Sequence, residues 1–342
     1  MRAERSRDSD CRVEAKLMVK QVHLINPMGN ASGGSEWRTL RLFEELSKHC
    51  DVQLWSSSEP NPRFSDYPMR RIDLSSKSFP MTGTFIIVGV YHELGPWIDL
   101  ARPTRTILIY NTSRLDQLQD RLHTLQCFGK PKVEIVFAAR WLMDACSLSG
   151  PVEMSPIDLQ RFAPAACERG DGPNGHFIIG RLSRDNSKKH HPDDVGIYRR
   201  LVSEGGSVKI MGGRCLAGEL EDVPEVTLLP SGWQEPDVFL KSLDCFFYRT
   251  SEKYFEPSGR VVSEAMACGL PVVCHRRGGY SEYIEDRVDG FLFDTDVEAV
   301  EILRTLKADP ALRKRVGQAA RKKLEASLAP AVRDKFLRFY TQ

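Results

Sequence analysis

The sequence lacks several features that would assign it to a specialised class of protein. No apolar run reaches the roughly 18 residues that a membrane-spanning helix needs, and no low-complexity segment is present. The net charge is only +2, without the excess of basic residues that marks nucleic-acid-binding proteins. We therefore expect no transmembrane segment and no nucleic-acid partner.

Cysteine pairs of the C-x-x-C type are absent as well. The nine cysteines are an odd number and are scattered along the chain. Cys245 and Cys274 lie in apolar runs, where cysteine behaves as a small hydrophobic residue. This pattern argues against a disulfide framework and a zinc site and predicts a cytoplasmic protein.

The rest of the composition is that of an ordinary folded protein, with 41% hydrophobic and 27% charged residues. A length of 342 residues suits two domains of about 150 residues each. The first residues, 1–17, are mostly charged or polar and lack the apolar core of a signal peptide. We predict that this segment is disordered.

Short apolar runs alternate with amphipathic stretches along the remaining chain. Strands are predicted in the first half at 22–25, 52–55, 85–90, 107–110 and 133–137, the last followed by a helix over about 138–148. A linker rich in Pro, Ala, Gly and charge spans about 150–175. The alternation restarts with strands at 176–179, 208–211, 226–229, 245–248 and 271–274, and a last helix is predicted over 329–340. This order predicts two α/β domains with parallel sheets, whose ligands bind in the loops after the strands.

The most informative stretch runs from Phe255 to Cys274. Pro257 and Ser258 predict the start of a helix at about Gly259, and Gly269 predicts its end. The start of a helix offers unpaired backbone N–H groups and therefore binds anions. Because glycine has no side chain, a diphosphate could approach there closely. The predicted anion site comprises Ser258, Gly259, Arg260 and Val261.

Two carboxylates flank this predicted anion site. Glu256 precedes the helix and Glu264 lies in its second turn, so the two are separated by roughly 10 Å at 1.5 Å per helical residue. Carboxylates accept hydrogen bonds from vicinal hydroxyls. The spacing suits a sugar at one end, a ribose at the other and a diphosphate between them.

This stretch resembles the Glu-x7-Glu motif of retaining glycosyltransferases of family 4, which have the GT-B fold. The similarity continues through 277–292, which has the Gly-Gly-x-x-Glu and Asp-Gly-Phe-Leu patterns of that family. The resemblance implies an α/β protein with two Rossmann-like domains and a donor cleft between them. It places an acceptor domain at 18–160, a nucleotide-sugar-binding domain at 161–325, and a C-terminal helix at 326–342 that packs back on the first domain.

A basic loop follows the predicted strand at 176–179. Arg181 and a lysine eight residues later could neutralise a diphosphate. The loop is similar to the family's Gly-Arg-Leu…Lys signature, in which both cations bind the donor phosphates. Here Asn186 stands where the family often has its lysine, so either Lys188 or Lys189 takes that role, and we favour Lys189.

In the first half, a glycine-rich loop ends in Gly33-Gly34 before a predicted helix. It is not a G-x-G-x-x-G loop, which disfavours a nicotinamide site. It matches the Gly-Gly loop of GT-B enzymes, which closes on the donor. His92 follows a strand, as a histidine often does in the family, and could face the acceptor or serve only in structure; Asn111 has similar standing.

Three further patterns favour structure over chemistry. The pair His190-His191 could suggest a metal, but neighbouring side chains point apart and no other ligands cluster nearby. The Asp-x-Asp at 294–296 is expected to cap a helix. The basic run at 312–323 is expected to be a solvated helix face, with contact to an inner membrane surface as the alternative.

Together the residues and the resemblance predict a metal-independent, retaining glycosyltransferase. The donor would be a nucleotide-diphosphate sugar, and the acceptor a glycan, a lipid-linked or a small molecule. No cofactor is predicted. The predicted catalytic residues are Glu256, Arg181, Lys189 and His92. The alternatives are a nucleotide-sugar 2-epimerase, which shares the fold, and a non-catalytic protein that binds sugar nucleotides.

Overall fold

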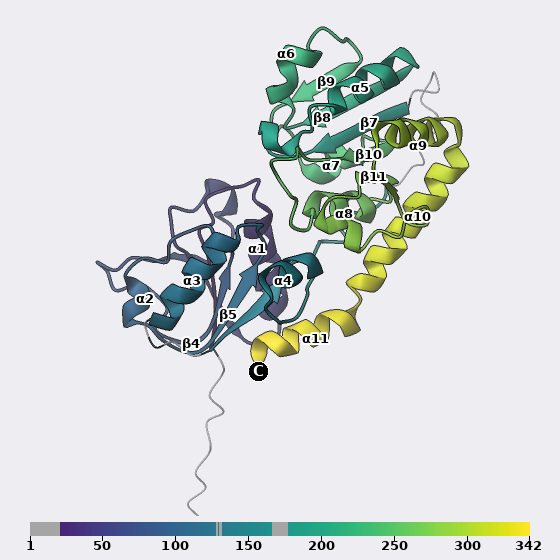
Figure 1. Ribbon diagram of the computed structural model, residues 1–342. Coiled ribbons are helices and arrows are strands. Elements are labelled where there is room, and N and C mark those ends of the chain that lie inside the picture. Colours follow the sequence, from purple (N-terminus) through teal and green to yellow (C-terminus); the bar gives the residue numbers. More distant parts are fainter. Residues whose placement is uncertain (1–20, 128, 130–131, 166–176) are drawn as a thin grey trace, which may run out of the picture.

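The computed structural model describes residues 21–127, 129, 132–165 and 177–342. The segment 1–17, predicted to be disordered, and part of the predicted linker at 150–175 lie outside these residues. The described chain forms two α/β domains, each built on a six-stranded parallel sheet (Figure 1). The two-domain α/β architecture predicted from the sequence is thus confirmed.

The first sheet has the strand order β3-β2-β1-β4-β5-β6. Its strands are β1 (Gln21–Asn26), β2 (Asp51–Ser56), β3 (Met69–Arg71), β4 (Thr82–Val88), β5 (Arg102–Tyr110) and β6 (Val133–Phe137). Its helices are α1 (Gly34–Leu46), α2 (Trp97–Leu100), α3 (Leu115–Cys127) and α4 (Arg140–Cys146). The central strands are buried on both faces, as in parallel sheets covered by helices, which explains their continuous apolar runs.

The second sheet repeats the same order, β12-β11-β10-β7-β8-β9. Its strands are β7 (Phe177–Leu182), β8 (Gly206–Met211), β9 (Val226–Leu229), β10 (Cys245–Tyr248), β11 (Val272–His275) and β12 (Phe291–Phe293). Its helices are α5 (Asp194–Ser203), α6 (Ala217–Leu220), α7 (Pro236–Leu240), α8 (Arg260–Ala267), α9 (Asp296–Ala308) and α10 (Pro310–Ser327). Both orders are the Rossmann order, which reverses between the first and fourth strand.

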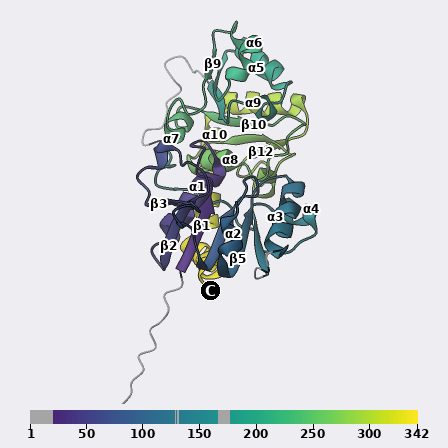
Figure 2. The same ribbon diagram turned by 90° about the vertical axis from the view of Figure 1, so that its left-hand side faces the viewer.

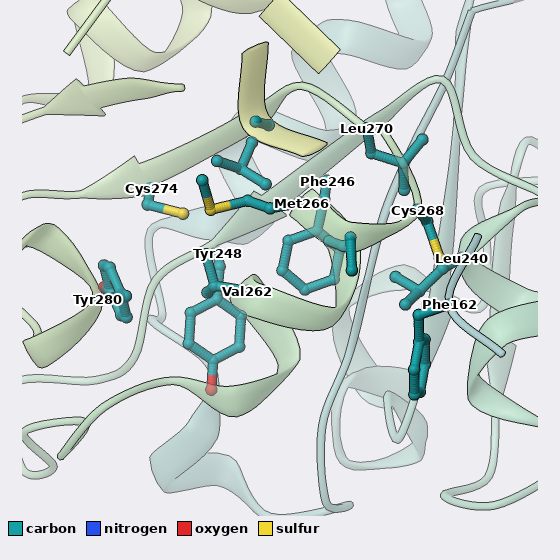
Figure 3. Packing of buried hydrophobic residues seen from close by; sticks show 14 of the residues in the cluster. Phe162, Leu240, Phe246, Tyr248, Val262, Met266, Cys268, Leu270, Cys274 and Tyr280 are labelled. Carbon is teal, nitrogen blue, oxygen red and sulfur yellow. The ribbon is translucent and has the colours of Figure 1, made fainter. Parts of the chain in front are cut away.

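Helix α8 is anchored to the second sheet by an apolar cluster (Figure 3). Val262 and Met266 are fully buried and pack with Phe246 and Tyr248 of β10. Gly269 then adopts the left-handed conformation, with φ of 72°, and ends the helix. This packing holds the N-terminus of α8 in place at the carboxyl edge of the sheet.

The chain finally returns to the first domain. Helices α10 and α11 (Pro330–Thr341) run from the second domain down to the first (Figures 1 and 2). On α11, Leu337 and Tyr340 join a core cluster of the first sheet. The buried Arg333 pairs with Glu153 at 2.7 Å and with Glu45 at 2.5 Å.

Several smaller features complete the fold. Thr295 caps α9 in a capping box with Glu298, so the Asp-x-Asp segment does begin a helix, as expected. The basic run at 312–323 lies within α10. In the described part of the chain, no helix is both long and apolar enough to cross a membrane.

Candidate functional site

A cavity of about 720 Å³ lies between the two domains. One wall comes from loops after β1, β4 and β5, and the other from loops after β7, β9 and β10. In open α/β sheets, ligands bind where the strand order reverses, here between β1 and β4 and between β7 and β10. Each domain therefore contributes this reversal point to the same cavity.

Ten of the twelve site residues predicted from the sequence line this cavity. They are Gly33, Gly34, Lys188, Lys189, Glu256, Ser258, Gly259, Arg260, Val261 and Glu264. Asn111 lines it too, whereas Arg181 and His92 do not.

The N-terminus of α8 opens onto the cavity at Gly259. This residue is left-handed, with φ of 68°, and a Cβ there would lie 2.6 Å from the Tyr280 ring. Glycine is therefore required for both its conformation and the space. No side chain of the described residues caps this helix, so its first N–H groups remain available to a ligand.

Glu256 lies at the centre of a buried polar cluster. Its Oε2 accepts hydrogen bonds from Lys189 Nζ at 2.8 Å and from the Tyr248 hydroxyl at 2.7 Å. Burial alone would raise the pKa of Glu256, but the charge of Lys189 and these hydrogen bonds outweigh it and lower the pKa. The carboxylate is consequently ionised at neutral pH. Lys189 also lies over the Tyr254 ring, 4.1 Å from its centroid.

Glu264 forms a second ion pair in the site, in addition to that of Glu256 with Lys189. Its Oε1 accepts a hydrogen bond from Arg260 Nε at 2.8 Å across one turn of α8. Burial raises the pKa of Glu264 even though Arg260 counteracts it. Arg260 Nη1 also donates to Ser155 Oγ at 2.8 Å and to the Pro156 carbonyl at 2.9 Å. Arg260 therefore connects α8 to the segment that leaves the first domain.

The glycine loop of the first domain faces α8 across the cavity. A Cβ on Gly34 would lie 3.7 Å from Arg260 Cδ, so the starts of α1 and α8 approach each other. A Cβ on Gly33 would collide with the carboxylate of Glu36, at 1.9 Å. Two helix N-termini, each a position that favours anions, thus face the same cavity.

Arg181, which the sequence predicted to bind phosphate, does not face the cavity in this structure. Its side chain is fully buried and lies outside the cavity lining. Its guanidinium donates to the Arg249 carbonyl at 2.6 Å and to the Lys189 carbonyl, and lies 3.5 Å from Asp194. Through these hydrogen bonds the Arg181 guanidinium holds the basic loop in place. Arg181 therefore stabilises the wall of the cavity without facing it.

His92 likewise lies outside the cavity lining. Its Nδ1 is 3.3 Å from Ser57 Oγ and 3.4 Å from the carbonyl of Glu93. Burial, with the charge of Arg121, lowers the pKa of His92 to about 4. A neutral, enclosed imidazole fits the structural role that the sequence left open. The neighbouring Tyr91 lines the cavity in its place.

Several charged residues that line the cavity were not predicted from the sequence, among them Arg184 and Glu36. Arg184 lines it and contributes to lowering the pKa of Glu256. It follows Arg181 by three residues in the same basic loop, so the loop's charge was the available signal. Glu36 is buried in the first turn of α1, and Tyr91 donates to its Oε1 at 3.4 Å. Burial raises the pKa of Glu36.

The structure also shows where the two candidate lysines and the two neighbouring histidines lie. Lys189 is buried against Glu256, whereas Lys188 is exposed at the cavity edge in a short 3₁₀ helix, η2 (Ser187–Lys189). His190 is buried, and its Nε2 lies 2.8 Å from the Gly212 carbonyl. Within the described ranges, no three His, Cys, Asp or Glu residues gather as a metal site would need.

Comparison with known proteins gives sequence matches that cover part of the chain. Residues 212–323 match the family model described as glycosyl transferases group 1. The chain is 45% identical over 69 residues to D-inositol 3-phosphate glycosyltransferase of an Arthrobacter species, covering 20% of this chain and 16% of that protein. It is 34% identical over 80 residues to spore coat protein SA of Bacillus subtilis, covering 22% and 21%. These matches span only about a fifth of either relative.

Solved structures match over nearly the whole chain. HepE of Anabaena, in complex with UDP and glucose, aligns with a TM-score of 0.73 at 13% identity over 94% of this chain and all of that one. Sucrose-phosphate synthase of Thermosynechococcus elongatus aligns with a TM-score of 0.71 at 16% identity over 94% and 98%. The architecture is thus that of GT-B glycosyltransferases. Over residues 212–323, about a third of its length, the chain is similar to the glycosyl transferases group 1.

Proposed function

We propose that this protein is a retaining glycosyltransferase that moves a sugar from a nucleotide-diphosphate sugar to a glycan, lipid-linked or small-molecule acceptor without a metal ion. One observation carries the proposal. The open N-terminus of α8 lies in the interdomain cavity between the Glu256–Lys189 pair and the Glu264–Arg260 pair. This arrangement offers an anion site flanked by an acid on either side.

The diphosphate would bind at the start of α8. Its charge would meet the N–H groups near Gly259 together with Lys189, Lys188 and Arg184, which all line the same cavity. Departure of the nucleoside diphosphate develops negative charge, which fixed cations and helix amides stabilise. In this proposal these groups do the work that a metal ion does in other transferases.

The two acids would hold the two rings of the donor. Lys189 and Tyr248 both bind Oε2 of Glu256, so Oε1 is left for a sugar hydroxyl as far as the described residues show. Glu264 would bind the ribose hydroxyls in the same way. Enclosure between the two domains would exclude water, so transfer would prevail over hydrolysis. Retention of the anomeric configuration rests on the resemblance of the Glu-x7-Glu stretch.

The test is incubation with a panel of nucleotide sugars, with release of nucleotide and transfer of sugar as readouts. UDP-sugars come first, because HepE binds UDP. Glu256→Ala should abolish transfer while the circular dichroism spectrum shows that the fold is kept. The matched control is Glu221→Gln, an exposed glutamate outside the cavity, which should retain full activity.

Three results would contradict the proposal. They are full transfer by Glu256→Ala, conversion of the donor to its 2-epimer, and donor binding without turnover across the panel. Loss of activity on chelation, restored by added metal, would contradict the metal-independent part alone. Proton NMR of the first product would test retention through its anomeric coupling.

A further inference from the structure

A tryptophan of the first domain contacts the loop that carries Glu256. Trp141, on α4, donates its indole N–H to the carbonyl of Pro257 at 2.8 Å. Its ring packs against Phe255, with centroids 4.3 Å apart. Trp141 thus contacts the residues immediately before and after Glu256, yet does not line the cavity.

A glutamate of the second domain fixes the helix that bears this tryptophan. Glu282 lies at the end of the short helix η4 (Gly279–Glu282). Its two carboxylate oxygens accept the backbone N–H groups of Arg140 and Trp141, each at 2.7 Å. These are the first two N–H groups of α4, which no side chain of its own domain caps in the described structure. A residue of one domain therefore caps a helix of the other.

The glycines before Glu282 make this contact close. The N–H of Gly279 donates to the Glu256 carbonyl at 2.9 Å. A Cβ on Gly279 would lie 1.8 Å from the Pro257 carbonyl oxygen and 2.8 Å from the Trp141 indole nitrogen. The backbone at Gly279 therefore lies directly against both the Trp141 indole and the loop that carries Glu256. A side chain at position 279 would have no space.

We propose that Trp141 is a positioning residue for Glu256, and that the Gly-Gly-x-x-Glu segment is a docking site for α4 of the first domain. Gly279, Glu282 and Trp141 all lie outside the cavity lining, so they act through the loop and not on a ligand. Separating the domains here would break the three hydrogen bonds to Glu282 and Pro257 together. The geometry of Glu256 is thereby coupled to the docking of the two domains. The inference rests on the proposed function for its kinetic effect, but not for the contact itself.

The test compares Trp141→Phe and Glu282→Gln with the wild-type enzyme. Phenylalanine keeps an aromatic ring against Phe255 and removes the indole donor, while glutamine replaces one of the two accepting oxygens by an amide. With a UDP-sugar that the wild type turns over, each variant should lower kcat about tenfold, the effect of one hydrogen bond of about 1.4 kcal/mol. The donor KM and the thermal midpoint should change little. Glu285→Gln, an exposed glutamate three residues on, is the control.

A double variant and hydrogen exchange separate positioning from general destabilisation. The fold-decrease in kcat of the Trp141→Phe/Glu282→Gln double variant should be less than the product of the two single fold-decreases. The reason is that both residues act through the same docking site. Amide exchange in residues 255–267 should accelerate in either variant, and this readout needs no turnover. It therefore tests the dock even if the proposed transferase activity fails. Unchanged kcat or unchanged exchange in Trp141→Phe would overturn the inference.

Discussion

Backbone conformation at one residue shapes the start of α8. Gly259 combines a φ of 68° with contact to the Tyr280 ring. Gly259→Ala should lower the free energy of unfolding by about 1–3 kcal/mol, because alanine is strained in this conformation and its methyl group has no space. Urea denaturation measures the change.

A second glycine supplies the control for that experiment. Gly196 lies inside α5, and a methyl group on its Cα would meet no atom outside the helix within 4 Å. Gly196→Ala should stabilise the protein by about 0.5–1 kcal/mol, since alanine favours helix. If both substitutions had the same sign, the role assigned to Gly259 would be wrong.

The pKa of Glu256 gives a second prediction at this scale. Its folded pKa lies below the ordinary value of 4.5, so ionisation favours the folded state. That stabilisation is complete above about pH 4.5 and is lost as the pH falls through the lowered folded pKa. Urea denaturation should therefore give a higher free energy of unfolding for the wild type than for Glu256→Gln at pH 7. This difference should become smaller as the pH is lowered to 3. Between wild type and the control Glu221→Gln, the free energy of unfolding should not show this pH-dependent difference.

The residues that the sequence singled out around α8 all line the cavity, because their signals are local. Gly259, Glu256 and Glu264 are set by a helix start and by spacing along one helix. Arg181, predicted to bind phosphate, lies outside the cavity lining because successive side chains of a strand alternate in direction. Leu182 lines the cavity, so its neighbour Arg181 points away, toward carbonyls far along the chain. Those carbonyls leave no local signal.

At the scale of elements, α11 is held by a buried ionic network. Glu153 is completely buried and binds Arg38 at 2.6 Å, Arg333 at 2.7 Å and the Tyr340 hydroxyl at 2.6 Å. Arg333→Met should cost about 3–5 kcal/mol, because removing one partner leaves buried negative charge only partly compensated. Thermal unfolding and urea denaturation measure the loss.

The control for this prediction lies on the same helix. Lys335 is exposed two residues away, and Lys335→Met should change stability by less than about 0.5 kcal/mol. Equal losses in the two variants would show that the network contributes nothing specific.

Longer elements were predicted better than short ones. The apolar runs of β1, β4 and β10 and the amphipathic α11 carry clear periodicity. The three-residue strands β3 and β12 are too short to show any period, and α3 was missed because most of its residues are polar. The dock between Glu282 and α4 joins residues 142 positions apart, so no pattern along the chain could indicate it.

At the scale of the whole molecule, the cavity between the domains should respond to a diphosphate. UDP that binds the folded state alone should raise the free energy of unfolding by about 2.7 kcal/mol at 100 times its Kd. A thermal shift assay with and without UDP measures this. In Lys189→Ala the shift should be smaller, because the diphosphate loses a cation and Glu256 loses its partner.

The exposed Lys335→Met variant should give the wild-type shift with UDP. A full shift in Lys189→Ala would show that the nucleotide binds away from the proposed site. No shift in the wild type, even with millimolar UDP, would instead point to a different base and call for the other nucleoside diphosphates.

The return of α11 to the first domain has a mechanical consequence. The polypeptide passes between the domains twice, once after residue 153 and once through α10 and α11. Two crossings restrict relative motion far more than a single tether, and favour opening about an axis that runs near both. A fluorophore attached at Gln342 would accordingly move with the first domain. Energy transfer to a second fluorophore on α9 would therefore measure the separation of the two domains at the cavity.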